Sequence, residues 1–245
     1  MKVIIVSTPE EMGKQAAQLI AAEMKKKPAF VLGLATGSTP ISLYQELSRL
    51  NRAGEIDFSQ VSSFNLDEYV GLLGTHDQSY RYFMNKNLFD HVNIDKKRTH
   101  VPDGMAKDLE AHCAEYEKMM KEAGGVDYQV LGIGSNGHIG FNEPGSSLAS
   151  RTRVVDLTEN TIKDNSRFFT SSKDVPTKAI SMGIGTILES KHAVLVANGA
   201  NKAEVVAASI EGCVTASVPA SALQFHPAIT WVITKDAATK LKRQY

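Results

Sequence analysis

Residues 30–40 read Phe-Val-Leu-Gly-Leu-Ala-Thr-Gly-Ser-Thr-Pro, and they join a short apolar run to an amphipathic segment. The apolar run Phe30–Ala35 predicts a buried strand, and the segment Pro40–Leu50 predicts a helix. Thr39 fits the N-cap of that helix, and Pro40 fits its first position, where a missing N–H costs nothing. A strand that turns directly into a helix is typical of a parallel sheet.

Strand-like and helical segments alternate along the rest of the chain. The other predicted strands are Val3–Val6, Val61–Phe64, Tyr128–Gly132, His192–Ala197 and Ile229–Thr234. The other predicted helices are Pro9–Lys25, Ser79–Phe89, Ala106–Glu122 and Lys202–Ile210. This alternation predicts an α/β fold with a mostly parallel sheet, and no linker or repeat divides residues 1–245 into more than one domain. Ligands of such sheets bind at the carboxyl ends of the strands, so the residues just after each strand are the functional candidates.

Charge and cysteine usage argue against several classes of protein. The 27 Lys and Arg residues balance the 27 Asp and Glu residues, so the basic excess typical of a nucleic-acid partner is missing. Cys113 and Cys213 lie far apart and outside any Cys-x-x-Cys motif, which fits a reducing compartment. No apolar run is long enough to span a bilayer, and the run Val3–Val6 is too short for a signal peptide. We therefore expect a soluble, cytoplasmic protein that binds neither nucleic acid nor membrane.

Gly37, Ser38 and Thr39 have the properties of an anion-binding loop. Gly37 allows a tight turn, and the free N–H groups of the following helix point toward a bound anion. Plain helix capping explains Thr39 and Pro40 but leaves Gly37 and Ser38 unexplained, so phosphate binding is favoured. The Gly-Lys-Ser/Thr ending of a nucleotide-binding loop is missing, which argues against a nucleoside triphosphate.

Lys202 is a second candidate for anion binding, in the segment Asn198-Gly199-Ala200-Asn201-Lys202 that follows a predicted strand. A lysine at the start of a helix is unfavourable for the helix dipole. A solvated surface position and a phosphate ligand explain it equally well.

Two acids, Asp67 and Glu68, follow the predicted strand Val61–Phe64. A carboxylate at a strand's carboxyl end is well placed to act as a general base. An ordinary turn or helix cap explains the pair about as well.

Residues 132–145 read Gly-Ile-Gly-Ser-Asn-Gly-His-Ile-Gly-Phe-Asn-Glu-Pro-Gly and contain the pattern G-x-G-x-x-G. Asp156, 19 residues beyond Gly137, completes the sequence pattern of a dinucleotide-binding fingerprint. The fingerprint requires a helix at its last glycine, and no helical apolar period follows here, so we reject a dinucleotide site. What remains is a loop in which His138 lies close to Asn136 and Glu143, a candidate acid/base group. With no second histidine at a ligand spacing and no cysteine nearby, we expect no metal.

Five segments together resemble the glucosamine-6-phosphate deaminase family. They are LATGSTP, NLDEY, GIGSNGHIGFNEPGSS, NSRFF and NGANKA, in the family's order and across essentially the whole chain. The resemblance implies a single-domain α/β fold with a Rossmann-like, mostly parallel sheet, helices on both faces and no cofactor. It also implies the isomerising deamination of glucosamine 6-phosphate to fructose 6-phosphate and ammonia, through ring opening and an enolamine.

The resemblance also assigns roles to residues. Asp67 corresponds to the base that removes the proton from carbon 2, and His138 to the group that opens the sugar ring. Asn136 and Glu143 correspond to the residues that orient and tune that histidine. The residues implied for the substrate phosphate are Gly37, Ser38, Thr39, Arg167 and Lys202.

The sequence departs from the family pattern in three places. Asn136 stands where many members have aspartate, and an amide cannot carry charge to the histidine. Allosteric hexameric members have a lysine two residues after the second arginine of their Arg-Thr-Arg motif. Here that arginine is Arg153, and the residue two positions after it is Val155. The sequence also stops at Tyr245, short of their longer C-terminal segment. We therefore expect simple saturation kinetics and a monomer rather than a hexamer.

Two alternatives remain. A 6-phosphogluconolactonase-like hydrolase shares the Gly-His loop but usually lacks the Phe-Asn-Glu-Pro continuation, so Glu143 favours the deaminase. A non-catalytic sugar-phosphate sensor would carry a helix-turn-helix, for which no segment is spare. The joint presence of Asp67, His138 and Glu143 also argues against a sensor.

Overall fold

The centre of the computed structural model, which describes residues 1–158, 162 and 175–245, is a seven-stranded sheet. Every neighbouring pair of its strands is parallel. In spatial order the strands are β1 (Lys2–Val6), β10 (Ile229–Thr234), β9 (His192–Ala197), β6 (Tyr128–Leu131), β2 (Val31–Leu34), β3 (Ser62–Asn65) and β5 (Thr99–His100). The predicted parallel α/β sheet is confirmed.

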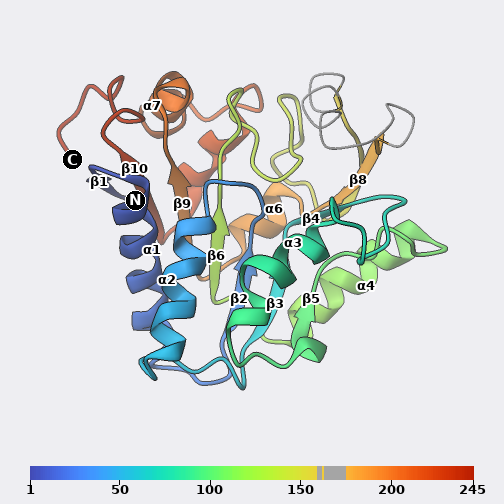
Figure 1. Cartoon of the computed structure of the whole chain (residues 1–245). Helices are drawn as coiled ribbons and strands as arrows, with labels where there is room; N and C mark the ends of the chain where they lie inside the picture. Colours follow the sequence, from blue (N-terminus) through green and yellow to red (C-terminus); the bar gives the residue numbers. More distant parts are fainter. Residues whose placement is uncertain (159–161, 163–174) are drawn as a thin grey trace.

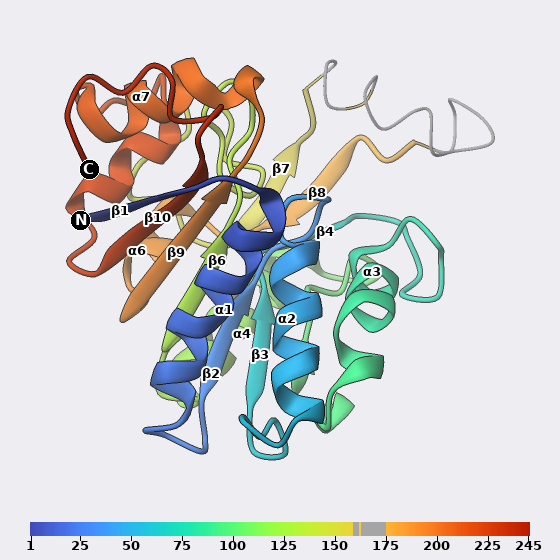
Figure 2. The same cartoon turned by 60° about the vertical axis from the view of Figure 1, so that its left-hand side comes forward.

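Helices cover both faces of this sheet, as Figures 1 and 2 show. α1 (Pro9–Met24) and α2 (Ile41–Arg52) lie side by side on one face, and α4 (Leu109–Glu122) and α6 (Ile184–Leu188) lie on the other. The remaining helices among the described residues are α3 (Tyr80–Asn87), α7 (Ala203–Glu211) and the 3₁₀ turns Phe89–His91, Lys96–Arg98, Ala200–Lys202 and Pro219–Phe225. No helix in the described part of the chain is both long and apolar enough to cross a membrane.

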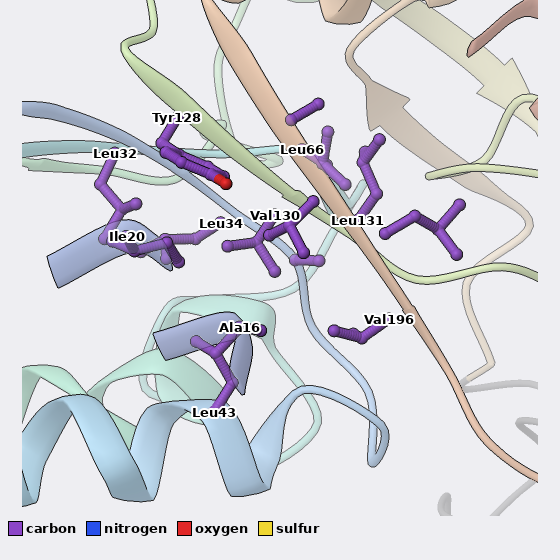
Figure 3. Packing of buried hydrophobic residues seen from close by; sticks show 14 of the residues in the cluster. Ala16, Ile20, Leu32, Leu34, Leu43, Leu66, Tyr128, Val130, Leu131 and Val196 are labelled. Atoms are coloured by element: carbon purple, nitrogen blue, oxygen red, sulfur yellow. The ribbon is translucent and has the colours of Figure 1, made fainter. Parts of the chain in front are cut away.

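The core forms where the first two helices meet the central strands (Figure 3). Ala16 and Ile20 of α1 and Leu43 of α2 pack with Leu32 and Leu34 of β2, and all five are fully buried. Full burial of one such aliphatic side chain stabilises the fold by about 1.5–3 kcal/mol. This packing fixes the carboxyl end of β2, from which the predicted anion loop emerges.

A second, three-stranded antiparallel sheet was not anticipated from the sequence. It consists of β4 (Asp67–Tyr69), β8 (Lys178–Ser181) and β7 (Arg153–Asp156), in that order. Asp67, expected in a loop, is instead the first residue of β4 and pairs with Ser181. The intervening Leu66 joins the two sheets, because its N–H donates to Leu34 O (3.0 Å) and its carbonyl accepts from Met182 N (2.6 Å).

The start of α2 differs from the prediction by one residue, because the helix begins at Ile41 and not at Pro40. Pro40 occupies the cap position with φ −80° and ψ 0°, and no side chain caps the helix. Thr39 as N-cap is therefore wrong. The physical reason is a turn in which Ile41 N donates to Ser38 O (3.3 Å), which delays the helix and leaves the Thr39 hydroxyl available to a ligand.

Candidate active site

Four adjacent strands end at one edge of the large sheet. They lie in the order β9, β6, β2, β3, and each is followed by a predicted functional segment. After β2 the chain runs outward through β3 and β5, then returns to β6 on the other side of β2. The edge between β2 and β6 is thus a topological switch point, where sheets of this type bind ligands.

The loop after β2 is open to solvent. Gly37 has φ +93°, and a side chain there would meet no atom within 4 Å. Gly37 and Ser38 are exposed, directly before the N-terminus of α2. Below them the Tyr44 hydroxyl accepts from Ala35 N (3.1 Å) and donates to Ala35 O (2.5 Å). The loop therefore presents its backbone to a ligand from a fixed base.

Lys202 lies after β9, at the junction of the 3₁₀ turn Ala200–Lys202 with α7. It is half-buried, and this desolvation lowers the pKa of its ammonium group. Among the described residues, no carboxylate pairs with it. A bound anion would offset the cost of partly burying this charge. Arg167, the other predicted phosphate ligand, lies outside the described residues.

The loop after β6 folds into a tight turn that holds His138. Gly134 N donates to His138 O (2.9 Å), and Gly137 takes φ +90° inside the turn. The imidazole lies directly over Gly134, where a Cβ would come within 2.2–2.4 Å of three ring atoms. The position of the ring therefore depends on the absence of a side chain at residue 134.

A chain of polar contacts orients the imidazole. Asn136 Oδ1 lies 2.7 Å from His138 Nδ1, and Asn136 Nδ2 donates to Glu143 Oε2 (2.6 Å). Glu143 Oε1 lies 3.4 Å from the same ring nitrogen. An amide oxygen only accepts, so Nδ1 carries the hydrogen in the neutral imidazole and Nε2 keeps its lone pair. Asn136 can thus fix the tautomer that makes Nε2 a base.

Asp67 is a buried carboxylate with few stabilising contacts. Its side chain is 6% exposed, and no described residue donates a hydrogen bond that lowers its pKa. Burial raises the pKa of Asp67 to about 8, and the neighbouring negative charge of Glu68 adds to the rise. A Cβ on Gly140 would lie 3.4 Å from Asp67 Oδ2, so the His138 loop passes directly beside this acid.

Comparison with known proteins identifies the family of this chain. The family model described as glucosamine-6-phosphate isomerases/6-phosphogluconolactonase matches residues 7–231. The chain belongs to this family. Within it, the chain is 52% identical to a glucosamine-6-phosphate deaminase of Clostridium perfringens (strain SM101 / Type A), over 99% of this chain and 100% of that one. It is 54% identical to the deaminase of Thermoanaerobacter pseudethanolicus, over 98% and 94%.

Solved structures separate the two branches of the isomerase/lactonase family. A monomeric glucosamine-6-phosphate deaminase superposes with a TM-score of 0.94 at 46% identity, covering 98% of this chain and 100% of that one. A 6-phosphogluconolactonase from Trypanosoma cruzi gives a TM-score of 0.78 at 19% identity, covering 99% and 97%. The second likeness shows the shared fold alone.

The structure joins His138, Asn136 and Glu143 through polar contacts and places Gly140 of the same loop beside Asp67. Lys202 follows β9 and the loop Gly37–Thr39 follows β2, with β6 between these two strands. A cavity of about 870 Å³ lies elsewhere, between α4, β7 and α6, and neither Asp67 nor His138 lines it. Within residues 1–158, 162 and 175–245, no cluster of three or more His, Cys, Asp or Glu could hold a metal ion.

Two residues at this candidate site were not singled out from the sequence. Gly134 makes room for the imidazole, but the sequence offers only one glycine among several in its loop. Tyr80 has its hydroxyl 3.2 Å from that of Tyr69 beside Asp67, and it also reaches the Thr36 side chain. Only the three-dimensional arrangement identifies Tyr80, because its sequence neighbourhood carries no motif.

Proposed function

We propose that the protein converts glucosamine 6-phosphate and water into fructose 6-phosphate and ammonia. The observation that carries this proposal is a buried carboxylate, Asp67, directly beside the loop that holds an oriented imidazole, His138, at the carboxyl ends of the sheet strands. A substrate that needs two separate proton transfers and has an anionic group suits such a site. The deaminases at 52–54% identity support the same reaction.

Ring opening is the first step, because carbon 2 becomes acidic only when carbon 1 is an aldehyde. We assign this step to His138. Its Nε2 takes the proton of the anomeric hydroxyl and returns it to the ring oxygen as the bond between carbon 1 and that oxygen breaks. Asn136 and Glu143 hold the His138 imidazole in the required tautomer.

Proton transfer between carbons is the second step, and we assign it to Asp67. Its carboxylate removes the proton from carbon 2, the electron pair forms the double bond between carbons 1 and 2, and the aldehyde oxygen takes up a proton from water to give the enolamine. Protonation at carbon 1 then gives an imine at carbon 2, and water replaces the nitrogen to release ammonia and the ketose. The substrate supplies its own carbonyl and amine, so we expect neither metal nor organic cofactor.

Phosphate binding orients the sugar for both steps. We assign it to the backbone and hydroxyls of Gly37, Ser38 and Thr39 together with Lys202 and Arg167. A charge held at the end of the substrate furthest from carbon 2 contributes to catalysis by orientation.

Product analysis tests the reaction directly. Purified protein treated with EDTA is given glucosamine 6-phosphate, and ammonia and fructose 6-phosphate are measured in parallel. The proposal predicts both products in equal amounts. Hydrolysis of 6-phosphogluconolactone without deamination would place the protein in the lactonase branch, and binding without either activity would favour a sensor.

Activity is expected to depend on pH through Asp67. A general base acts only when ionised, and the pKa of Asp67 is raised to about 8. kcat/KM should therefore increase with pH through about 8 and fall about tenfold for each pH unit below that value. Initial rates across the pH range give the profile. A profile that stays flat into the ordinary carboxylate range would show that the base has no raised pKa.

Replacing Lys202 by alanine should weaken substrate binding more than turnover. A charge-assisted hydrogen bond to phosphate contributes about 1.5–3 kcal/mol, so KM should rise about 10–100-fold. Lys14, exposed on α1, provides the matched control, and its replacement by alanine should leave KM unchanged. Equal KM values for the two variants would remove Lys202 from the phosphate site.

We also propose that the protein is a monomer with hyperbolic kinetics, as the solved relative described as monomeric suggests. Light scattering measures the mass in solution, and a mass several times that of one chain would contradict the monomer. A sigmoidal rate curve made hyperbolic by N-acetylglucosamine 6-phosphate would contradict the hyperbolic kinetics. The cytoplasmic location stays a prediction from the sequence.

A further inference from the structure

Glu68, next to Asp67, is a buried acid to which the mechanism above gives no role. It is 2% exposed and directly follows the proposed base in β4. A carboxylate is costly to bury unless hydrogen bonds compensate it, so the burial of Glu68 requires an explanation.

Four hydrogen bonds satisfy the Glu68 carboxylate. Its Oε1 accepts from Tyr69 N (2.9 Å) and Tyr80 N (2.9 Å), and its Oε2 accepts from Ser79 Oγ (2.8 Å) and Arg81 N (3.0 Å). Three of these donors are backbone N–H groups, which cannot accept a proton in return. Burial raises the pKa of Glu68 and these bonds oppose the rise, so the ionised form is the one that the contacts fit.

The same contacts join the strand that carries Asp67 to helix α3. Tyr80 N and Arg81 N belong to the first turn of α3, where backbone N–H groups have no partner inside the helix. Ser79 caps the same helix by accepting from Tyr82 N (3.3 Å). An anionic side chain at this position also interacts favourably with the helix dipole. Glu68 thus fixes α3 to β4 at the residue adjacent to the base.

Helix α3 in turn contacts residues next to Asp67 and next to the anion loop. The Tyr80 hydroxyl lies 3.2 Å from that of Tyr69 and reaches Thr36, directly before the anion loop. Arg81 donates to Thr99 Oγ1 (2.7 Å) and Thr99 O (2.8 Å) at strand β5. A shift of α3 would therefore be transmitted both to the side of Asp67 and to the loop proposed to hold phosphate.

We propose that Glu68 is a positioning residue for the base: its carboxylate fixes α3 against β4, and its ionised form places a negative charge beside Asp67. This inference rests on the proposed function. The charge makes proton loss from Asp67 harder, and for the same reason makes ionised Asp67 a stronger base. Two like charges on adjacent buried residues are destabilising, and the hydrogen bonds from α3 offset that cost.

Other titratable groups face Asp67 from the surrounding elements. The phenols of Tyr44 (α2), Tyr69 (β4), Tyr80 (α3) and Tyr116 (α4) interact with its charge. Burial raises the pKa of each phenol above its ordinary value, to about 12 for Tyr69, so all four stay neutral where Asp67 titrates. Arg81 interacts with Glu68, and His138 lies on the loop that passes Asp67 at Gly140.

The test compares Glu68→Gln and Glu68→Asp with Ser79→Ala in the full-length protein. Glutamine removes the charge but keeps the length, whereas aspartate keeps the charge but is too short to reach all four donors. Ser79→Ala removes one donor and the helix cap and leaves the carboxylate in place. All three variants should have a lower Tm, because each weakens the attachment of α3.

The acidic limb of the profile of kcat/KM against pH separates charge from simple packing. Glu68→Gln should move this limb down by about one pH unit, whereas Glu68→Asp and Ser79→Ala should leave it close to the wild-type position. An unchanged limb in folded Glu68→Gln would overturn the inference, even if its Tm falls. The proposed function is judged separately, by whether the wild-type protein releases ammonia at all.

Discussion

Replacing Asp67 by asparagine is expected to lower kcat by about 10²–10⁴-fold while changing KM little. Asparagine has nearly the same shape but cannot accept the proton of carbon 2. The residues proposed to bind the phosphate are untouched, so the substrate should still bind. Steady-state kinetics and a binding isotherm with glucosamine 6-phosphate measure the two effects. Near-wild-type turnover would show that Asp67 is not the base.

The same substitution should not harm folding, which separates lost chemistry from lost structure. The pKa of Asp67 is about 8 in the folded state, against an ordinary value of 3.8. Between these values the folded protein holds a proton that the unfolded chain has lost, so this group's contribution to stability falls as pH rises. Asparagine carries no such cost. The Tm of the variant, relative to wild type, should therefore increase as the pH is raised from acid to about 8.

Replacing Gly134 by alanine should lower kcat by about 10²-fold, although neither glycine nor alanine at this position can transfer a proton. The new methyl group would lie 2.2–2.4 Å from the His138 ring, so the ring must leave its position and its 2.7 Å contact with Asn136. A side chain can rotate away at little cost in stability, so the protein should still fold. The loss should appear in the ring-opening step.

Gly132→Ala is the matched control for this prediction. Gly132 lies in the same loop, and a Cβ there would meet no atom within 4 Å. Its replacement should leave kcat close to the wild-type value. If Gly134→Ala were equally active, the imidazole position over Gly134 would not be the catalytic one.

The sequence allowed much of this site to be predicted, for a specific physical reason. In a parallel sheet the carboxyl ends of neighbouring strands meet at one edge, so the segments after β2, β3, β6 and β9 could be expected to converge. Short-range spacing also placed Asn136 and Glu143 near His138, and the structure brings these three into contact.

The rest depends on long-range contacts that local patterns do not encode. β4 forms only because β8, more than a hundred residues later, pairs with it, so Asp67 could not be recognised as a strand residue. The cap of α2 shifts away from Thr39 because Ser38 O makes a turn with Ile41 N. The second acid of the Asp67–Glu68 pair gains a role only when α3 is placed against it.

The central claim is that Asp67 removes the proton from carbon 2, and proton NMR in deuterium oxide tests it most directly. The carbon 2 signal of glucosamine 6-phosphate is followed with wild-type protein and with Asp67→Asn. The account predicts that the signal disappears with the wild type and persists with the variant, even when the variant is saturated with substrate. Exchange at the wild-type rate in the variant would contradict the account, because another group would then be the base.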